Sequence, residues 1–92
     1  MTKYSNKEKS SNSFLFKNKS DQDLILYNDN YNEFNFVIDS LIKVCGHYKE
    51  QATQCTVIAH LKGKSKVKKG AYSELKSMKK GLREKGLNAN IE

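Results

Sequence analysis

Two cysteines and two histidines carry most of the reactive chemistry available to this sequence: Cys45, His47, Cys55 and His60. Nucleophilic catalysis needs a nucleophile, a base and an orienting group within reach of one another. Only the histidines could serve as the base near neutral pH. Each cysteine falls on the apolar face of a predicted helix, where a free cysteine behaves as a small hydrophobic side chain. The sequence therefore predicts no catalytic residue and a protein that is not an enzyme.

Zinc binding is a second chemistry that these residues could support, through the pairs Cys45-x-His47 and Cys55-x4-His60. Structural zinc sites usually combine two cysteines separated by about two to four residues with a second close pair of ligands. Neither spacing fits this pattern, and both cysteines belong to the predicted core. We predict no metal site and no cofactor.

A dense strip of lysines lies between Lys62 and Lys69. Such a strip would attract phosphates in a salt-sensitive manner, but stacking aromatic residues are missing from it, apart from Tyr72 at its end. A solvated edge strand explains the strip equally well. Arg83 is the only arginine of the sequence, although arginine is the residue that most often reads phosphates and guanine edges. We predict no nucleic-acid partner, with weak nucleic-acid binding through Lys62–Lys69 as an alternative.

A polar cluster, Asn28-Asp29-Asn30-Tyr31, separates a short apolar run from a helical pattern. Asn and Asp are typical both of turns and of helix N-termini, so this pattern by itself favours a turn. His60 falls near the end of a second predicted helix, where a surface or half-buried histidine is the ordinary interpretation. Among the polar patterns of this sequence, the cluster is nevertheless the one to which we assign a function.

The first elements that must position these residues follow from hydrophobic periodicity. Residues 24–27 form an apolar run that predicts a buried strand. Apolar residues at helical spacing predict a helix over residues 34–45 and a second over residues 49–61. Gly46 and Gly63 follow these patterns directly, as is typical of helix C-termini.

The second half of the chain continues with a strand, a helix and a strand. Alternating lysines over residues 64–72 predict an exposed edge strand, in which lysine also discourages aggregation. Ser73 is the predicted N-cap of a third helix, which Gly86 ends, and residues 87–91 predict a last strand. The order β-α-α-β-α-β predicts an α+β fold, a small antiparallel three-stranded sheet with three helices packed on one face.

The chain has 92 residues, a mass of 10.5 kDa and a formal net charge of +7, which is the size of one domain. No apolar window is long enough to span a bilayer, and residues 1–12 lack the apolar segment of a secretory signal. Two cysteines are too few for a disulfide scaffold. We predict a cytoplasmic monomer that does not bind a membrane.

Residues 1–20 are rich in Ser, Asn and Lys and contain one apolar patch, Phe14-Leu15-Phe16. A segment of this composition cannot bury enough apolar surface to offset the entropy of ordering the chain. We therefore predict a flexible N-terminal extension over residues 1–20 and a folded core over residues 21–92. The patch could be a docking segment, and the sequence leaves its role open.

The polar cluster and the residues around it resemble a known family. The run from Leu26 to Tyr31, followed by Phe36-Val37-Ile38, resembles the strand–NDD–Y–xxxFV signature of ClpS, the bacterial adaptor that delivers N-degron substrates to the Clp protease. Ala52-Thr53-Gln54 and residues 59–64 resemble the A-T-Q and V-H-x-x-G-K segments of the same family. The resemblance covers residues 23–92 in order. It implies an adaptor that binds N-terminal Leu, Phe, Tyr or Trp.

The resemblance also implies roles for particular residues of this sequence. Asn28, Asp29 and His60 match the residues that bind the substrate α-amino group. The first side chain of the substrate would enter a hydrophobic pocket lined by Phe34, Val37, Thr56, Ala59 and Leu87. Asn30 and Asn32 match positions of the same pocket that touch its mouth or the peptide backbone. Glu74 and Lys79 match contacts with the partner, a ClpA-like or ClpC-like AAA+ unfoldase, and residues 1–20 match the extension that engages it.

Several positions depart from the family pattern. Asn30 replaces the usual second Asp, and Phe34 stands where Met is common. Thr56 and Ala59 are smaller than the usual Met and Val, so the preference among Leu, Phe, Tyr and Trp stays open. A second hypothesis is a protein-interaction module like the C-terminal domain of the ribosomal stalk protein, which resembles the same fold and docks factors through a helix surface.

Overall fold

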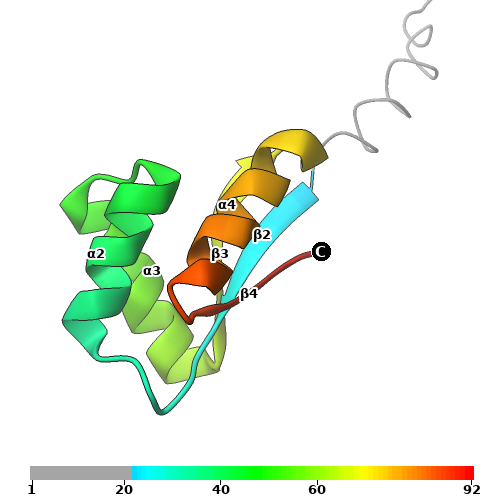
Figure 1. Cartoon of the computed structure of the whole chain (residues 1–92). Coiled ribbons are helices and arrows are strands. Elements are labelled where there is room, and N and C mark those ends of the chain that lie inside the picture. Colours follow the sequence, from blue (N-terminus) through cyan, green and yellow to red (C-terminus); the bar gives the residue numbers. More distant parts are fainter. Residues whose placement is uncertain (1–21) are drawn as a thin grey trace, which may run out of the picture.

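The computed structural model describes residues 22–92, so the predicted extension over residues 1–20 and its patch Phe14–Phe16 lie outside the described part (Figure 1). The described chain contains β2 (Gln22–Tyr27), α2 (Phe34–Cys45), α3 (Lys49–Lys62), β3 (Lys64–Gly70), α4 (Tyr72–Glu84) and β4 (Asn88–Ile91). The order β-α-α-β-α-β is therefore confirmed. The predicted α+β class is also confirmed.

The three strands form one antiparallel sheet in the order β3-β2-β4. β2 is central, and β3 lies at an edge, as the alternating lysines predict. A bulge between Leu24 and Ile25 shifts the register against β3. The edge position explains the lysines, because charged side chains along an unpaired strand edge oppose pairing with another chain.

The core lies between the sheet and its three helices. Leu24 and Leu26, two residues apart on β2, both join the apolar core, whereas Ile25 between them is buried outside it. Since successive side chains of a strand point to opposite faces, the helices cover the face that carries Leu24 and Leu26. α4 contributes Leu75 and Leu82 to the same core, and neither is exposed to solvent.

Both helices before the edge strand end as predicted, at glycines in the left-handed region. Gly46 follows α2 with φ +72°, and Gly63 follows α3 with φ +92°. The amide of each glycine donates to a carbonyl four residues earlier, Gly46 to Ile42 at 3.1 Å and Gly63 to Ala59 at 2.8 Å. The left-handed backbone of each glycine ends its helix where the chain must turn, and the hydrogen bond satisfies one of the last carbonyls.

The predicted start of the third helix is wrong. Ser73 lies inside α4, and Ala71 occupies the N-cap position without a side-chain cap. The amides of Glu74 and Leu75 both donate to the Ala71 carbonyl, at 3.1 and 3.0 Å, so the helical hydrogen bonds begin before Ser73. The predicted strand 64–72 accordingly ends at Gly70.

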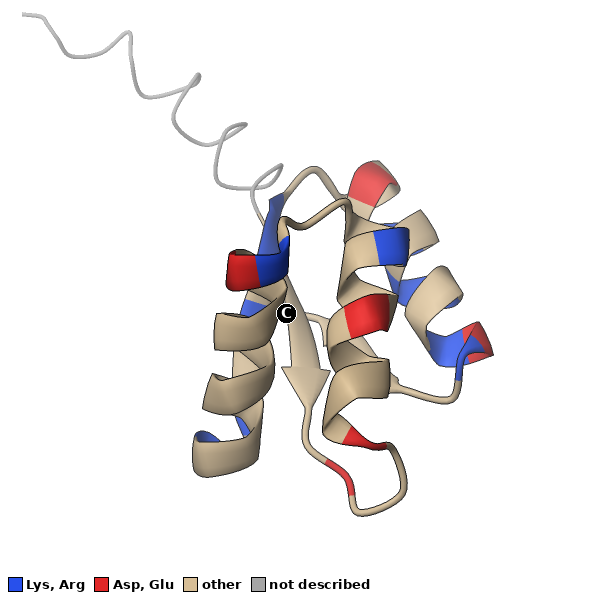
Figure 2. Cartoon of the chain, turned by 90° about the vertical axis from the view of Figure 1, so that its left-hand side faces the viewer, with Lys and Arg blue, Asp and Glu red and all other residues tan. Residues whose placement is uncertain are grey.

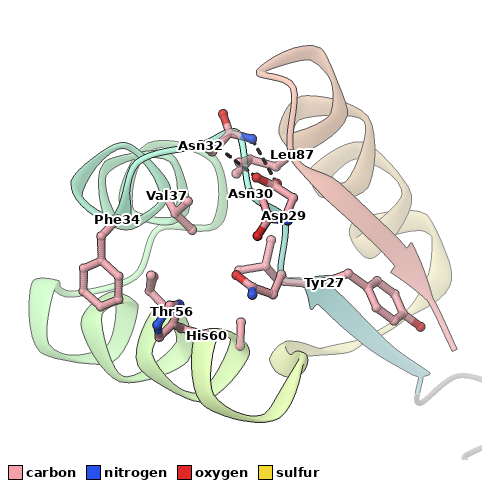
Figure 3. A pocket seen from close by; sticks show the side chains of 12 residues that line it. Tyr27, Asp29, Asn30, Asn32, Phe34, Val37, Thr56, His60 and Leu87 are labelled. Atoms are coloured by element: carbon pink, nitrogen blue, oxygen red, sulfur yellow. Dashed lines mark hydrogen bonds between the residues drawn. The ribbon is translucent and has the colours of Figure 1, made fainter.

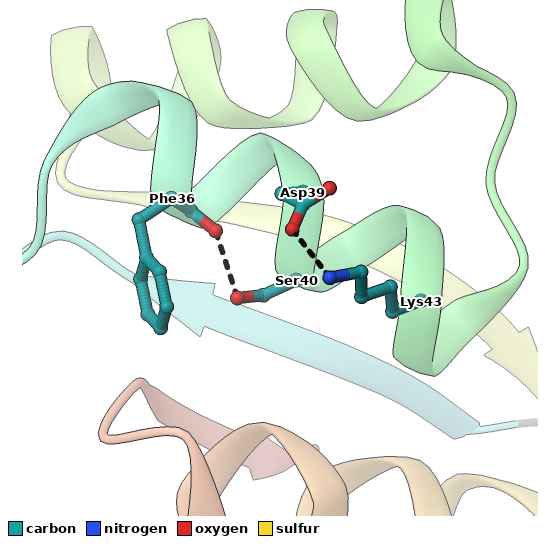
Figure 4. A network of polar contacts seen from close by, with 4 residues as sticks. All are labelled: Phe36, Asp39, Ser40 and Lys43. Atoms are coloured by element: carbon teal, nitrogen blue, oxygen red, sulfur yellow. Dashed lines mark hydrogen bonds and ion pairs between the residues drawn. The ribbon is translucent and has the colours of Figure 1, made fainter.

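The polar contacts of α2 are local and leave its buried face free to pack (Figure 4). The buried Ser40 hydroxyl donates to the Phe36 carbonyl at 2.8 Å, which satisfies it within the helix. On the exposed side Lys43 pairs with Asp39 at 3.0 Å, one helical turn away. Exposed pairs of this kind contribute little, about 0.3–0.5 kcal/mol.

His47, between α2 and α3, is a buried histidine without hydrogen bonds. Its side chain is 5% exposed, and neither ring nitrogen has a hydrogen-bonding partner within residues 22–92. Burial lowers the pKa of His47 below its ordinary value of 6.5. The polar backbone of Val67 lies close enough to offset part of this shift without forming a hydrogen bond, and the positive charge of Lys68 adds to the shift. The folded state therefore holds this imidazole in its neutral form.

This burial predicts a loss of stability in mild acid. As the pH falls below 6.5, His47 becomes protonated in the unfolded chain but stays neutral in the folded chain. The free energy of unfolding therefore decreases until the pH reaches the lower pKa of His47 in the folded state. His47→Leu is expected to reduce the difference in that free energy between pH 7.5 and pH 5.5, as measured by urea unfolding. If the free energy of unfolding changes equally between these pH values in the wild type and in His47→Leu, this role of His47 is contradicted.

Candidate functional site

A cavity of about 190 Å³ opens where the C-terminal end of β2, the start of α2 and the end of α3 meet (Figure 3). Its lining residues are Leu26, Tyr27, Asn28, Asp29, Asn30, Asn32, Phe34, Val37, Thr56, Ala59, His60 and Leu87. Every residue predicted to bind the substrate amino group or its first side chain lies in this lining. Leu26 and Tyr27 are the two lining residues to which the sequence assigned no role.

Asn28 reaches the site because the end of β2 is tied to the end of α3. The Asn28 amide donates to the Gly63 carbonyl at 3.0 Å, across 35 positions of the chain. Gly63 in turn closes the last turn of α3, which carries His60. Together with the pairing of Tyr27 with Lys64 between β2 and β3, this bond places Asn28 and His60, from distant parts of the sequence, on the same cavity.

Asp29 organises the loop between β2 and α2. Its Oδ1 accepts hydrogen bonds from the amides of Tyr31 and Asn32, both at 2.8 Å, and its Oδ2 accepts one from the Asn32 side chain at 3.0 Å. Partial burial raises the pKa of the Asp29 carboxyl, but these hydrogen bonds lower it more, so that it lies below the ordinary value of 3.8. The carboxylate therefore stays charged at neutral pH, and Oδ2 keeps one acceptor position free.

His60 and Phe34 both line the cavity, and their side chains contact each other. Their rings meet edge to face, with centroids 6.4 Å apart and planes at 88°. His60 lies in the last turn of α3 and Phe34 is the first residue of α2, so the contact joins two helix ends. Edge-to-face packing of this kind favours one orientation of the imidazole.

The inner wall of the cavity is apolar. Ala59 and Leu87 are almost fully buried, and Val37 packs against the same core. The buried Thr56 hydroxyl donates to the Ala52 carbonyl at 2.8 Å, so its only proton is already used within α3. An apolar cavity of about 150 Å³ is enough to bind benzene, and this one therefore has room for an aromatic ring.

The electrostatic character of the cavity is set by one carboxylate. Within residues 22–92, Asp29 is the only acidic residue of the lining, and no Lys or Arg contributes to it. α3 is also free of Asp, Glu, Lys and Arg between Glu50 and Lys62 (Figure 2). A cation at the mouth would meet amide, imidazole and carboxylate acceptors without a competing positive side chain beside them.

Glu74 and Lys79 lie on α4 and do not line the cavity. Lys79 belongs to a shallow groove on the outer side of that helix, formed by Tyr72, Lys76, Lys79, Lys80, Arg83 and Glu84. The Nε of Arg83 donates to the Ala89 carbonyl at 2.8 Å, which fixes the guanidinium beside β4. This groove is a surface separate from the cavity and mostly basic.

Over residues 22–92 no group of three His, Cys, Asp or Glu side chains is arranged to hold a metal ion. Cys45 and Cys55 are free, buried thiols, and burial raises the pKa of Cys45 to about 11. Within the same range no helix is long and apolar enough to cross a membrane.

Comparison with known proteins gives one family and one fold. A family model described as the ATP-dependent Clp protease adaptor protein ClpS matches residues 17–90. Among solved structures, the chain is similar to Agrobacterium tumefaciens ClpS2 bound to L-phenylalaninamide, with 21% sequence identity, a TM-score of 0.73, and coverage of 80% of this chain and 96% of that chain. A search of the curated proteins found no match. The likeness in structure supports the fold, and the family model covers most of the chain, including all the cavity residues: the chain belongs to the ClpS family of Clp protease adaptors.

Proposed function

We propose that the cavity binds the free N-terminus of a protein whose first residue is Leu, Phe, Tyr or Trp, and that the chain delivers this protein to a Clp AAA+ unfoldase. The observation that carries the proposal is the composition of one cavity, with polar acceptors at its mouth and an apolar interior of aromatic size. The ligand of the related ClpS2 structure, phenylalaninamide, has the matching two halves, an α-amino group and a benzyl side chain.

The acceptors suit an α-ammonium group. An ammonium has three donors and therefore needs three converging acceptors. Asn28 can offer its side-chain oxygen, Asp29 the free position on Oδ2, and His60 a ring nitrogen. Each charge-assisted hydrogen bond contributes about 1.5–3 kcal/mol. Asn30, where the family commonly has a second Asp, leaves Asp29 as the single negative charge of the lining.

The apolar interior supplies the second part of the affinity. Burial of one Leu or Phe side chain contributes about 1.5–3 kcal/mol. Part of the total is lost to the ordering of the peptide, so that an affinity in the micromolar range is expected. Because the hydroxyl proton of Thr56 is already used, the wall around Thr56, Ala59 and Leu87 favours an apolar side chain over one that needs a donor.

The experiment is fluorescence anisotropy with two labelled peptides that differ only in their first residue, Phe or Ala. The Phe peptide is expected to bind at least about tenfold more tightly, because only its ring fills the interior. Both peptides keep the α-amino group, so the ratio isolates the contribution of the side chain. Equal affinities would contradict a side-chain pocket.

The partner surface in this proposal is the α4 groove with Lys79, together with Glu74. Family members act with Clp AAA+ proteases, and Lys79 lies among other basic residues away from the cavity. Lys79→Glu is expected to abolish degradation of a Phe-first substrate by the cognate Clp protease and to leave peptide affinity unchanged. Lys85→Glu, an exposed charge reversal outside the groove, is the matched control. Full degradation activity in Lys79→Glu would show that Lys79 is not part of the interface with the unfoldase.

A further inference from the structure

We propose that Asn32 is a positioning residue of the pocket: its side chain fastens the Asp29 loop to the turn before β4 and thereby holds Leu87 in the cavity wall. The inference rests on the proposed function, because it assigns a role within the same pocket. It also replaces a simpler expectation for Asn32, that of a direct contact with the substrate.

The side-chain amide of Asn32 has both of its protons in use. Its Nδ2 donates to Asp29 Oδ2 at 3.0 Å and to the Gly86 carbonyl at 3.0 Å (Figure 3 shows the Asp29 end). Both partners are acceptors, so the amide can have only this orientation, since the reverse would set its oxygen against two other oxygens. Asn32 therefore has no donor left for a substrate.

The Gly86 end of this contact controls the position of Leu87. Gly86 has φ +87° and lies in the tight turn that follows α4. Its amide donates to the Arg83 carbonyl at 2.9 Å, and the Leu87 amide donates to the Leu82 carbonyl at 3.0 Å. The turn is thus anchored to α4 on one side and to Asn32 on the other. Leu87, the next residue, is 4% exposed and lines the cavity.

Asn32 accordingly joins the two halves of the site. Asp29 belongs to the proposed ammonium subsite, and Leu87 belongs to the apolar wall. The two lie 58 positions apart in the chain, and the Asn32 side chain is the hydrogen-bonded link between their segments. Loss of this link is expected to loosen the apolar wall and so to reduce discrimination between first residues.

The link can be removed without removing the turn that holds Asp29. The two backbone amides that donate to Asp29 Oδ1, those of Tyr31 and Asn32, do not depend on the Asn32 side chain. Asn32→Ala therefore deletes only the two side-chain bonds. Asn32→Asp has nearly the same shape but exchanges the donor for a charged acceptor, which faces Asp29 Oδ2 and the Gly86 carbonyl and repels both.

The test combines peptide affinity with amide hydrogen exchange of the free protein. Asn32→Ala is expected to weaken binding of the Phe-first peptide roughly tenfold and to weaken the Ala-first peptide less. Asn32→Asp is expected to weaken the Phe-first peptide more than Asn32→Ala does. The Leu87 amide is expected to exchange faster in both variants. Asn35→Ala, an exposed change on α2 outside the cavity, should alter none of these quantities.

Two outcomes would overturn the proposal, and neither depends on the other. An unchanged exchange rate of the Leu87 amide in both Asn32 variants would show that Asn32 does not hold the turn. An unchanged ratio of the Phe-first and Ala-first affinities in Asn32→Ala would show that the link has no part in discrimination. Failure of the proposed function has a different signature, since the wild-type protein would then bind neither peptide while the exchange measurement stays interpretable.

Discussion

Acetylation of a Phe-first peptide at its α-amino group is expected to weaken its binding by at least a hundredfold. The modification removes the positive charge and two of the three donors, and so removes at least two charge-assisted hydrogen bonds to Asn28, Asp29 and His60. At about 1.5–3 kcal/mol each, their loss amounts to roughly two orders of magnitude or more. Anisotropy with the same fluorophore on both peptides measures the ratio directly.

The control for this experiment is acetylation elsewhere on the same peptide. A Phe-first peptide acetylated on an internal lysine keeps its free N-terminus and is expected to bind as tightly as the unmodified one. If N-terminal acetylation leaves the affinity within about threefold, the cavity recognises the side chain without the amino group. The assignment of Asn28, Asp29 and His60 to an ammonium subsite would then be wrong.

Replacement of Asp29 by alanine is the second change for which we expect a large effect. Asp29→Ala removes the negative charge nearest the proposed ammonium position and also the acceptor of three hydrogen bonds from Tyr31 and Asn32. The loop then loses both its charge and its shape, and affinity for the Phe-first peptide is expected to fall by more than a hundredfold. Calorimetric titration with the same peptide measures this loss.

Asp29→Asn separates the two contributions. The asparagine oxygen can still accept from the amides of Tyr31 and Asn32, so the backbone turn is kept, while the charge and the acceptor of the Asn32 side chain are lost. Its affinity is expected to fall between those of the wild type and Asp29→Ala. Asp39→Ala removes an exposed charge from α2, outside the cavity, and serves as the control for net charge. Equal affinities of Asp29→Asn and Asp29→Ala would show that the turn makes no separate contribution.

The Asp29 turn also has a defined pH dependence. Because the folded pKa lies below the ordinary value of 3.8, the hydrogen-bonded carboxylate stabilises the fold above that value. This stabilisation is lost as the pH falls from 3.8 through the folded pKa. The acid sensitivity of His47 lies at higher pH, since it begins below 6.5. The two residues therefore affect stability in separate pH ranges.

Much of the fold could be predicted because its signals are local. Gly46 and Gly63 directly follow the helical patterns, and glycine readily adopts the left-handed conformation that ends a helix. The alternation of lysines around Val67 predicts an edge strand without knowledge of the strand that pairs with it. Ser73 shows the limit of such signals. Its hydroxyl makes it a good N-cap by residue type, yet the hydrogen bonds of α4 begin at the Ala71 carbonyl. The preference of a residue type for the N-cap therefore determines the start of a helix less strongly than the backbone geometry of the whole turn does.

For the cavity, the lining residues could be predicted but their hydrogen bonds could not. Its polar and apolar residues follow from a family resemblance, which identifies positions but gives no hydrogen bonds. The link from Asn32 to Gly86 joins residues 54 positions apart, and no periodicity or spacing in the sequence indicates it. The unsatisfied, buried His47 was missed for the same reason, because its environment comes from the packing of distant elements. Contacts of this kind follow only from the assembled fold.

The central claim, that this cavity recognises a free N-terminal residue, is tested most directly by mapping where a ligand binds. The measurement is a titration of isotope-labelled protein with the unmodified Phe-first peptide, followed by amide NMR spectra. We predict that the largest shift changes fall on Asn28, Asp29, Ala59 and His60, and that the acetylated peptide produces none of them at the same concentration. Shift changes confined to the basic groove of α4, or the same changes with both peptides, would contradict the claim.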